Sequence, residues 1–188
     1  MGFEYFHKEV QITGKHSRYV DEMWEQNQIQ NSYFKRLVDL YTIAPVIGLR
    51  ARKKAAADYS DGKRTVPVTQ ILELEKDLEI IMQTILLLDD TTKLSVEQKI
   101  DRAFRGPTTE EEFKENVNLF NDYLRGGIEV LYECLIDREL TISDIYTDSK
   151  IGNIVAIFDN PLVWIFIIMK LIIQYKKYNI FEINFWFL

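Results

Sequence analysis

The chain has 188 residues and a mass of 22.3 kDa, which is enough for one domain whose core needs neither disulfides nor a structural metal. Hydrophobic residues make up 47% of the sequence and charged residues 28%, which excludes the polar, highly charged class of disordered proteins. The net charge of −6 excludes a surface that is basic throughout, so any contact with nucleic acid has to be local.

The cysteine content and the N-terminus both predict a cytoplasmic protein. Cys134 is the single cysteine of the sequence, so no disulfide can form within the chain, as is usual in a reducing compartment. The first residues contain no apolar run of the length that a signal peptide needs. Gly2 is followed at position 6 by Phe6 and not by the Ser or Thr of a myristoylation signal.

The first predicted element is helical and extends from about Ser17 to Tyr59, as one long helix or two, because apolar residues recur there at helical spacing. Pro45 lacks an amide hydrogen, so we expect a kink or a break near residues 43–44. The alanines Ala55 to Ala57 favour helix up to the turn residues that follow. A loop is predicted from Ser60 to Pro67.

The next segment predicts an amphipathic helix whose wide apolar stripe suits the centre of a bundle. Its charged residues fall between apolar residues that are three or four apart, namely Ile71, Leu74, Leu78, Ile81, Ile85 and Leu88, and further apolar residues widen the stripe, namely Leu72, Ile80, Met82, Leu86 and Leu87. After a break at Asp89–Lys93, Ser95 and Gln98 have the spacing of a capping box. A short helix is expected from there to about Phe104.

A longer helix is predicted after the break at Arg105–Pro107. Thr108 and Glu111 have the spacing of a second capping box. Apolar residues at helical spacing define its buried face: Phe113, Val117, Phe120, Leu124, Ile128, Leu131 and Leu135. Gly126 and Gly127 in its middle indicate either a bend or a close helix crossing, of which we favour the crossing.

The composition changes after Lys150, where Ile, Phe, Asn, Tyr, Lys and Trp become abundant. Residues 162–173 form an apolar run of 12 residues that contains Lys170, which is shorter than the roughly 20 residues of a membrane span. Three interpretations stay open: a buried terminal helix or strand, which we favour, an appended out-of-frame segment, and a segment on a membrane surface. We therefore divide the chain into a helical domain, residues 1–150, and a hydrophobic C-terminal segment, residues 151–188.

Together these elements predict an all-α fold, a bundle of four to five helices over about Ser17 to Ile136 with a hydrophobic C-terminal appendage. The helices should be separated at Pro45, at Ser60–Pro67, at Asp89–Lys93 and at Arg105–Pro107.

The sequence contains no motif of a known catalytic, metal or cofactor site. His7 and His16 have no metal-ligand motif around them, and we expect surface or structural roles for both. Cys134 falls on the last predicted helix, where a buried, inert thiol is expected. The glycines do not form a phosphate-binding pattern. We therefore expect no catalytic residues, no metal and no cofactor, and rank an enzyme third among the possible functions.

A local basic cluster is the most informative feature for function, since it opposes the acidic charge of the chain. It comprises Arg50, Arg52, Lys53, Lys54, Lys63 and Arg64. The favoured interpretation is that these cations complement the C-terminal end of a helix dipole and form a solvated surface. The alternative is contact with phosphates or with an acidic partner, where Tyr59 would stack on a base or ribose.

Two stretches, YFKRLVDLYTIA at 33–44 and GLRARKKA at 48–55, lead to a resemblance. Over about Lys15 to Ile136 the chain resembles small helical accessory proteins encoded in bacterial phage-defence and DNA-modification operons, by general character and without a shared catalytic motif. The resemblance implies a subunit that cooperates with a larger enzyme, and it assigns no functional residues.

The expected function is therefore that of a non-catalytic helical subunit of a bacterial multiprotein assembly, favoured to be one that acts on DNA or in phage defence. Its expected partners are other protein subunits or further copies of the chain. The alternative is direct nucleic-acid binding through the basic cluster, from Arg50 to Arg64. Membrane attachment is ranked last.

Overall fold

A computed structural model describes residues 3–24 and 32–137, and the predicted C-terminal segment and its boundary near residue 150 lie outside them. The described part is mainly helical and contains six helices and one two-stranded antiparallel sheet. In chain order the elements are β1 Val10–Thr13, α1 Gly14–Met23, α2 Leu37–Arg50, β2 Lys63–Val66, α3 Val68–Glu73, α4 Glu75–Leu88, α5 Val96–Phe104 and α6 Glu110–Leu135.

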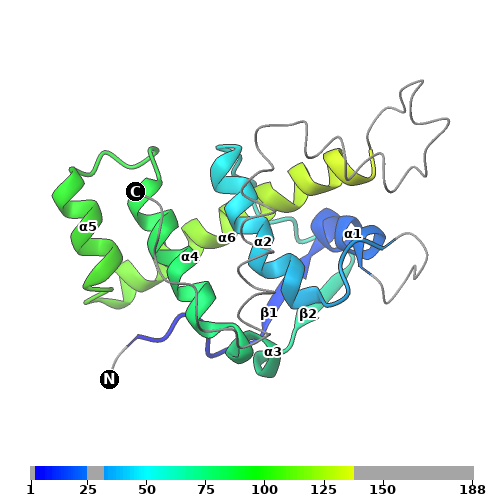
Figure 1. The fold of residues 1–188 in the computed structure, drawn as a ribbon, viewed down its shortest axis with the longest axis horizontal. Helices are drawn as coiled ribbons and strands as arrows, with labels where there is room; N and C mark the ends of the chain where they lie inside the picture. Colours follow the sequence, from blue (N-terminus) through cyan, green and yellow to red (C-terminus); the bar gives the residue numbers. More distant parts are fainter. Residues whose placement is uncertain (1–2, 25–31, 138–188) are drawn as a thin grey trace, which may run out of the picture.

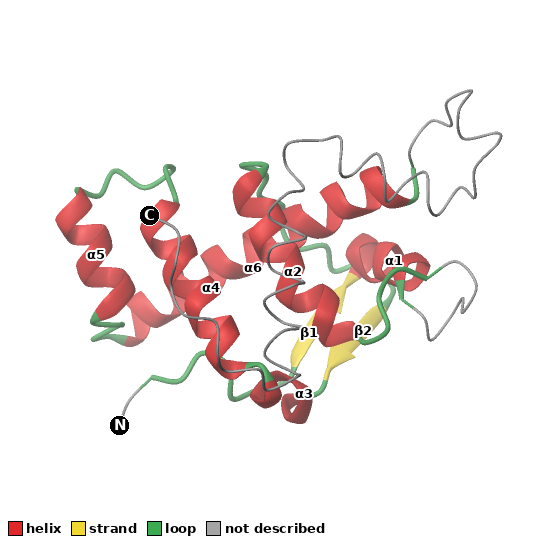
Figure 2. Cartoon of the chain, in the orientation of Figure 1, coloured by secondary structure: helices red, strands yellow, loops and turns green. Residues whose placement is uncertain are grey.

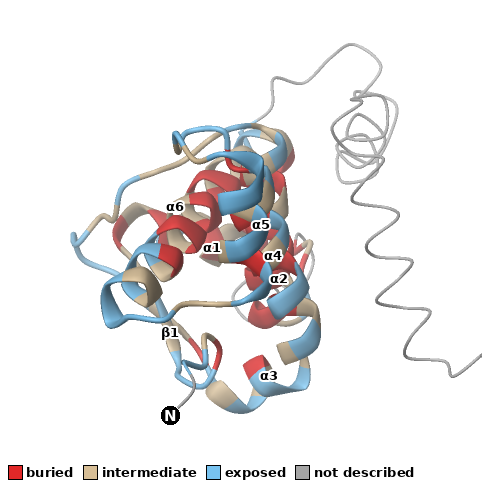
Figure 3. Cartoon of the chain, turned by 90° about the vertical axis from the view of Figure 1, so that its left-hand side faces the viewer, coloured by how far each residue is buried: buried red, intermediate tan, exposed pale blue. Residues whose placement is uncertain are grey.

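The long helix α6 is the centre of the fold (Figure 1). α2 packs along it, α1 and α4 also contact it, and α5 packs on α4 at one end of the molecule. Buried residues are concentrated on α2, α4 and α6, whereas most residues of α5 are exposed (Figure 3). The core includes Leu40, Tyr41, Phe120, Tyr123 and Ile128. The prediction of a mainly helical fold is confirmed for this part of the chain.

α2 and α6 cross at close range because small residues meet on both helices. A Cβ atom on Gly48 would lie 2.1 Å from the carbonyl oxygen of Tyr123, and one on Gly126 would lie 1.9 Å from that of Lys53, just after α2. Neither position can hold a side chain while the two backbones stay this close. α6 nevertheless continues without a break from Glu110 to Leu135, so the predicted close crossing is confirmed.

The predicted break at Pro45 is wrong, because α2 is a continuous helix that contains this proline. A proline in a helix interior costs about 3 kcal/mol through the lost hydrogen bond and the clash with the preceding turn. The neighbouring side chains of α2, including Leu40, Tyr41 and Ala44, are buried in the core. Their burial offsets the cost that the local sequence indicates.

The predicted extension of this helix to Tyr59 is also wrong. α2 ends at Arg50, and two residues later Arg52 has a positive φ of 52°. The amide of Arg52 donates to the carbonyl of Leu49 at 3.1 Å, and the amide of Lys53 donates to that of Gly48 at 2.9 Å, which is the Schellman arrangement of a helix end. The chain then passes beside α6 without forming a helix or strand, and the amide of Ala55 donates to the carbonyl of Asp122.

The sheet was not predicted. β1 and β2 pair antiparallel, with Val10 opposite Val66 and Thr13 opposite Lys63, and Figure 2 shows the two strands beside α1. The predicted loop from Ser60 to Pro67 therefore contains a strand. Pairing between four-residue segments so far apart in sequence leaves little local signal.

The predicted amphipathic helix after Pro67 is divided into α3 and α4 at Leu74. Six residues of its predicted stripe are buried, namely Ile71, Leu78, Ile81 and Ile85, together with Met82 and Leu86 of the predicted widening. Leu74 is half-buried, whereas Leu72, Ile80 and Leu88 are exposed. The core face is confirmed, and the widening of the stripe by Leu72 and Ile80 is wrong.

One of the two predicted capping boxes is confirmed. The hydroxyl of Ser95 accepts from the amide of Gln98 at 3.2 Å, and the Gln98 side chain accepts from the amide of Ser95 at 2.8 Å, so α5 begins as predicted. The second prediction is shifted by one residue. Thr109 caps α6 by accepting from the amide of Glu112, whose carboxylate accepts from the amide and hydroxyl of Thr108.

Candidate functional site

The six cations of the predicted basic cluster do not form one open surface. Three of them bind carboxylates at the end of α4 or on α6, namely Arg52, Lys53 and Lys54. Arg64 binds Asp21 of α1 through two contacts, Nε–Oδ1 of 2.5 Å and Nη2–Oδ2 of 2.6 Å. Four of the six positive charges are therefore balanced by acids within the fold.

Lys54 has the least exposed side chain of these four cations. Its Nζ lies 2.8 Å from Oδ1 of Asp89, whose side chain is 1% exposed, and 4.8 Å from the centre of the Tyr123 ring. The Tyr123 hydroxyl donates to the same Asp89 oxygen at 2.6 Å. Burial alone would raise the pKa of Asp89, but hydrogen bonds from Lys54, Tyr123 and Thr91 lower it to about 2. Asp89 is therefore a buried, ionised anchor for Lys54.

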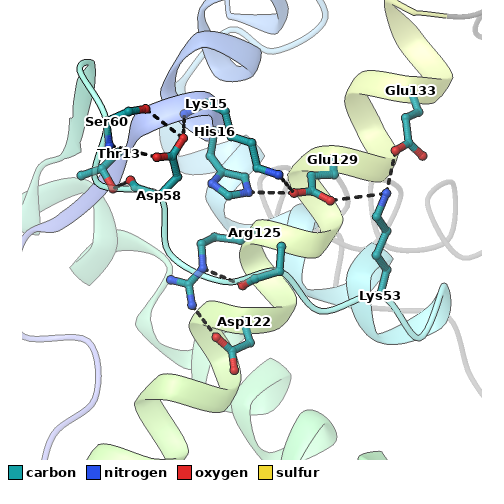
Figure 4. A network of polar contacts seen from close by, with 11 residues as sticks. Thr13, Lys15, His16, Lys53, Asp58, Ser60, Asp122, Arg125, Glu129 and Glu133 are labelled. Atoms are coloured by element: carbon teal, nitrogen blue, oxygen red, sulfur yellow. Dashed lines mark hydrogen bonds and ion pairs between the residues drawn. The ribbon is translucent and has the colours of Figure 1, made fainter.

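Lys53 belongs to a second network, which joins α1 and the segment after α2 to α6 (Figure 4). Its Nζ lies 2.6 Å from Glu133 and 3.4 Å from Glu129. Glu129 also contacts Nζ of Lys15 at 2.7 Å and Nε2 of His16 at 3.1 Å. Burial raises the pKa of Glu129, but the hydrogen bonds from Lys15 and His16 leave it below its usual value. One carboxylate thus links three elements.

The two histidines lie in opposite environments. His16 is 1% exposed, and its Nδ1 has no hydrogen-bond partner among the described residues. Burial lowers the pKa of His16, although the hydrogen bond to Glu129 opposes this shift. His7 is exposed, and its hydrogen bond to Glu75 raises its pKa. These positions agree with the structural and surface roles that we expect for the two residues.

Asp58 connects the segment after α2 to the start of α1 through hydrogen bonds. Its Oδ2 accepts from the amide of Lys15 at 2.7 Å, and its carbonyl accepts from the Thr13 hydroxyl at 2.6 Å. The hydrogen bonds from the backbone of Lys15 and from Ser60 lower the pKa of Asp58 to about 2. The Asp-x-Ser spacing is a turn signal that could have been read from the sequence. This network, also drawn in Figure 4, is structural.

Arg50, Tyr59 and Lys63 remain open to solvent. The side chains of Arg50 and Lys63 are exposed and have no carboxylate partner among residues 3–24 and 32–137. The Tyr59 side chain is 88% exposed. Together with Arg52, whose side chain is 80% exposed although it pairs with Asp90, these residues are the exposed part of the predicted phosphate-contacting surface.

A second surface was missed by our sequence analysis. Val96, Ile100 and Phe104 follow one another at intervals of four on α5, and they are 66%, 46% and 63% exposed. Residues four apart lie on one side of a helix. We call these three residues the α5 stripe. Their spacing between the capping box and Arg105 was the available signal.

The α5 stripe is exposed because α5 contacts the rest of the fold through other residues. Ala103 is buried, Lys99 donates to the carbonyl of Asp89, and Nε of Arg102 donates to Oδ1 of Asn116 at 2.7 Å. A surface helix ordinarily turns its apolar side to the core. Here polar contacts hold the helix while much of its apolar side faces solvent.

Metal ligation and membrane insertion have no support in the described ranges. Within residues 3–24 and 32–137, no group of three or more His, Cys, Asp or Glu side chains is placed to hold a metal ion. No helix of this part has the length and apolar character of a bilayer span.

Cys134 is half-buried, and burial raises the pKa of its thiol.

Comparisons with protein-family models, with curated proteins and with solved structures found no match.

Proposed function

We propose that this chain is a non-catalytic helical subunit of a bacterial multiprotein assembly and that it binds another protein through the α4–α5 hairpin. The favoured setting is an assembly that acts on DNA or in phage defence, as the resemblance of its sequence implies. The α5 stripe carries this proposal. An apolar side of a helix that is held in water is typical of an interaction surface.

The distribution of exposed apolar residues supports the same pair of helices. Of the eight large hydrophobic residues that are exposed in the described ranges, five lie on α4 and α5, namely Ile80, Leu88, Val96, Ile100 and Phe104. Aromatic and branched side chains of this kind supply most of the binding energy when they enter a partner's pocket. The hairpin is therefore a better candidate for a protein contact than the paired basic cluster.

The test compares two double variants of α5 in the full chain. Ile100→Ser with Phe104→Ser alters the stripe, whereas Glu97→Ser with Asp101→Ser places the same residues on exposed polar positions of the helix. Each tagged variant is purified from the native bacterium, and its partners are identified by mass spectrometry and by co-elution at fixed stoichiometry.

A partner that co-elutes with the parent and with the Glu97/Asp101 variant, but not with the Ile100/Phe104 variant, is the expected result. The proposal fails if no protein co-elutes with the parent, or if the partners stay bound when the stripe is changed. Circular dichroism of both variants checks that α5 is retained.

Direct nucleic-acid binding is the second candidate, favoured by the exposure of Arg50, Tyr59 and Lys63. Replacing Lys54 would leave Asp89 buried and unpaired, so loss of binding in such a variant would not separate contact from misfolding. The informative variant is Arg50→Gln with Lys63→Gln. If these residues contact phosphates, this variant binds duplex or single strands more weakly than the parent does. The affinity of the variant also depends less steeply on salt concentration than that of the parent. No binding by the parent at low salt rejects this candidate.

A further inference from the structure

The α5 stripe is matched in chemistry by a segment of the same chain that lies outside the described residues. We propose that residues 162–173 dock on the α5 stripe of their own chain. The inference deepens the proposed function and rests on it for its biological role, since the docked segment would shield the stripe until a partner takes its place.

The composition of residues 162–173 is the first argument. The sequence LVWIFIIMKLII contains one charged residue, Lys170, among 12. A contiguous apolar surface of this size is rarely left in water by a soluble domain. The stripe offers an apolar surface that nothing covers among residues 3–24 and 32–137. Contact between the two would remove both from solvent.

The chain is long enough for this contact. Arg102 of α5 binds Asn116 of α6, so α5 lies near the N-terminal half of α6, whereas residue 138 follows the other end. At 1.5 Å per residue, Asn116 and Leu135 are roughly 29 Å apart along the helix. The residues between Asp137 and Leu162 could span up to about 80 Å when extended.

The small size of the stripe favours a segment of the same chain over a second copy. The three partly exposed side chains of the stripe alone offer on the order of 300 Å², whereas a separate protein needs about 800 Å² and would also have to cover the exposed Ile80 and Leu88 of α4. A tethered segment needs less contact because its linker keeps it at an effective concentration in the millimolar range. The stripe therefore suits an intramolecular occupant.

Charge at the edge of the stripe is also complementary. Glu97 is exposed beside Val96 on α5, while Lys170, Lys176 and Lys177 lie in and just after the proposed segment. Opposite charges around an apolar contact favour the correct pairing.

The experiment places the photo-crosslinker p-benzoylphenylalanine on α5 of the full chain. At position 100 it replaces Ile100 within the stripe, and at position 101 it replaces Asp101 on the polar side as the matched control. A second stripe position, Phe104, guards against a local effect at Ile100. After irradiation, the monomer is isolated and the crosslinked peptides are identified by mass spectrometry.

We expect crosslinks from positions 100 and 104 to residues 162–173 within one chain, several-fold more than from position 101. Ile165→Asp with Phe166→Asp in the segment should abolish them. Crosslinks mainly to a second copy, none to the segment, or equal yields from all three positions would overturn the proposal. If a partner co-elutes in a way that depends on Ile100 but these crosslinks are absent, the proposed function is supported and the docking is rejected. If the crosslinks form but no such partner co-elutes, the docking is supported and the proposed function is rejected.

Discussion

A Cβ atom built on Gly127 would lie 1.7 Å from the carbonyl oxygen of Ala44. This is far inside the normal contact distance, and the obstructing atom belongs to the backbone of α2. A side chain here must push α2 and α6 apart along the crossing that organises the fold. Gly127 is therefore required by its neighbours and not by its own backbone conformation.

We predict that Gly127→Ala lowers the free energy of unfolding by about 2–4 kcal/mol, because overpacking displaces a buried helix. The matched control is Asn118→Ala, an exposed position of the same helix, where alanine should be neutral or slightly stabilising. Urea unfolding of both variants measures the difference. Equal midpoints for Gly127→Ala and the parent would contradict the close crossing.

A second prediction concerns Arg52, which has the left-handed φ of 52° at the end of α2. Arg52→Gly should raise the free energy of unfolding by about 0.5–1 kcal/mol, because glycine takes this conformation without strain. The lost contact with Asp90, 3.5 Å long between exposed side chains, contributes little. Arg50→Gly is the control, since Arg50 is the last residue of the helix and glycine there should be destabilising. Thermal unfolding that ranks the two variants in the reverse order would show that the helix ends elsewhere.

The third prediction compares adjacent residues of α4. Ile81 is 4% exposed and Ile80 is 55% exposed. Ile81→Asp should cost about 3–5 kcal/mol, since an unpaired charge would be forced into the core. Ile80→Asp should change the stability by about 0.5 kcal/mol or less. Similar chemical unfolding curves for the two variants would contradict the orientation of α4.

The helical framework could be predicted because its signals are local. The Ser95 capping box, the buried face from Ile71 to Ile85 and the glycine pair on α6 each depend on residues within a few turns of one another. Pro45 misled the prediction for the opposite reason. Its local cost is overcome by the packing of α2 on α6, which single-sequence propensities do not contain.

The basic cluster could be located from the sequence, but its partners could not. Lys53 binds Glu133, which is 80 positions away, and Lys54 binds the buried Asp89. Which carboxylate meets which cation follows from how α2 and α6 cross. The α5 stripe was within reach of periodicity, but that it faces solvent depends on how Lys99 and Arg102 hold the helix.

The last prediction is a pH dependence of opposite sign for the two histidines. His16 has a lowered pKa in the fold because it is buried, so protonation favours the unfolded chain. Its contribution to stability is full above the unfolded pKa of about 6.5 and is lost as the pH falls below that value. His7 has a raised pKa because it bonds Glu75. Its contribution is full below about 6.5 and is lost as the pH rises through its folded pKa.

Single variants separate the two effects between pH 5.5 and 7.5, a window chosen because it brackets the histidine pKa of about 6.5 and carboxylates stay ionised there. In His7→Gln, the free energy of unfolding should fall as the pH is lowered, because His16 alone titrates. In His16→Gln, it should rise as the pH is lowered, because His7 alone titrates. Urea unfolding at several pH values measures both slopes. Slopes of the same sign in the two variants would mean that His16 is not held neutral in the interior beside Glu129.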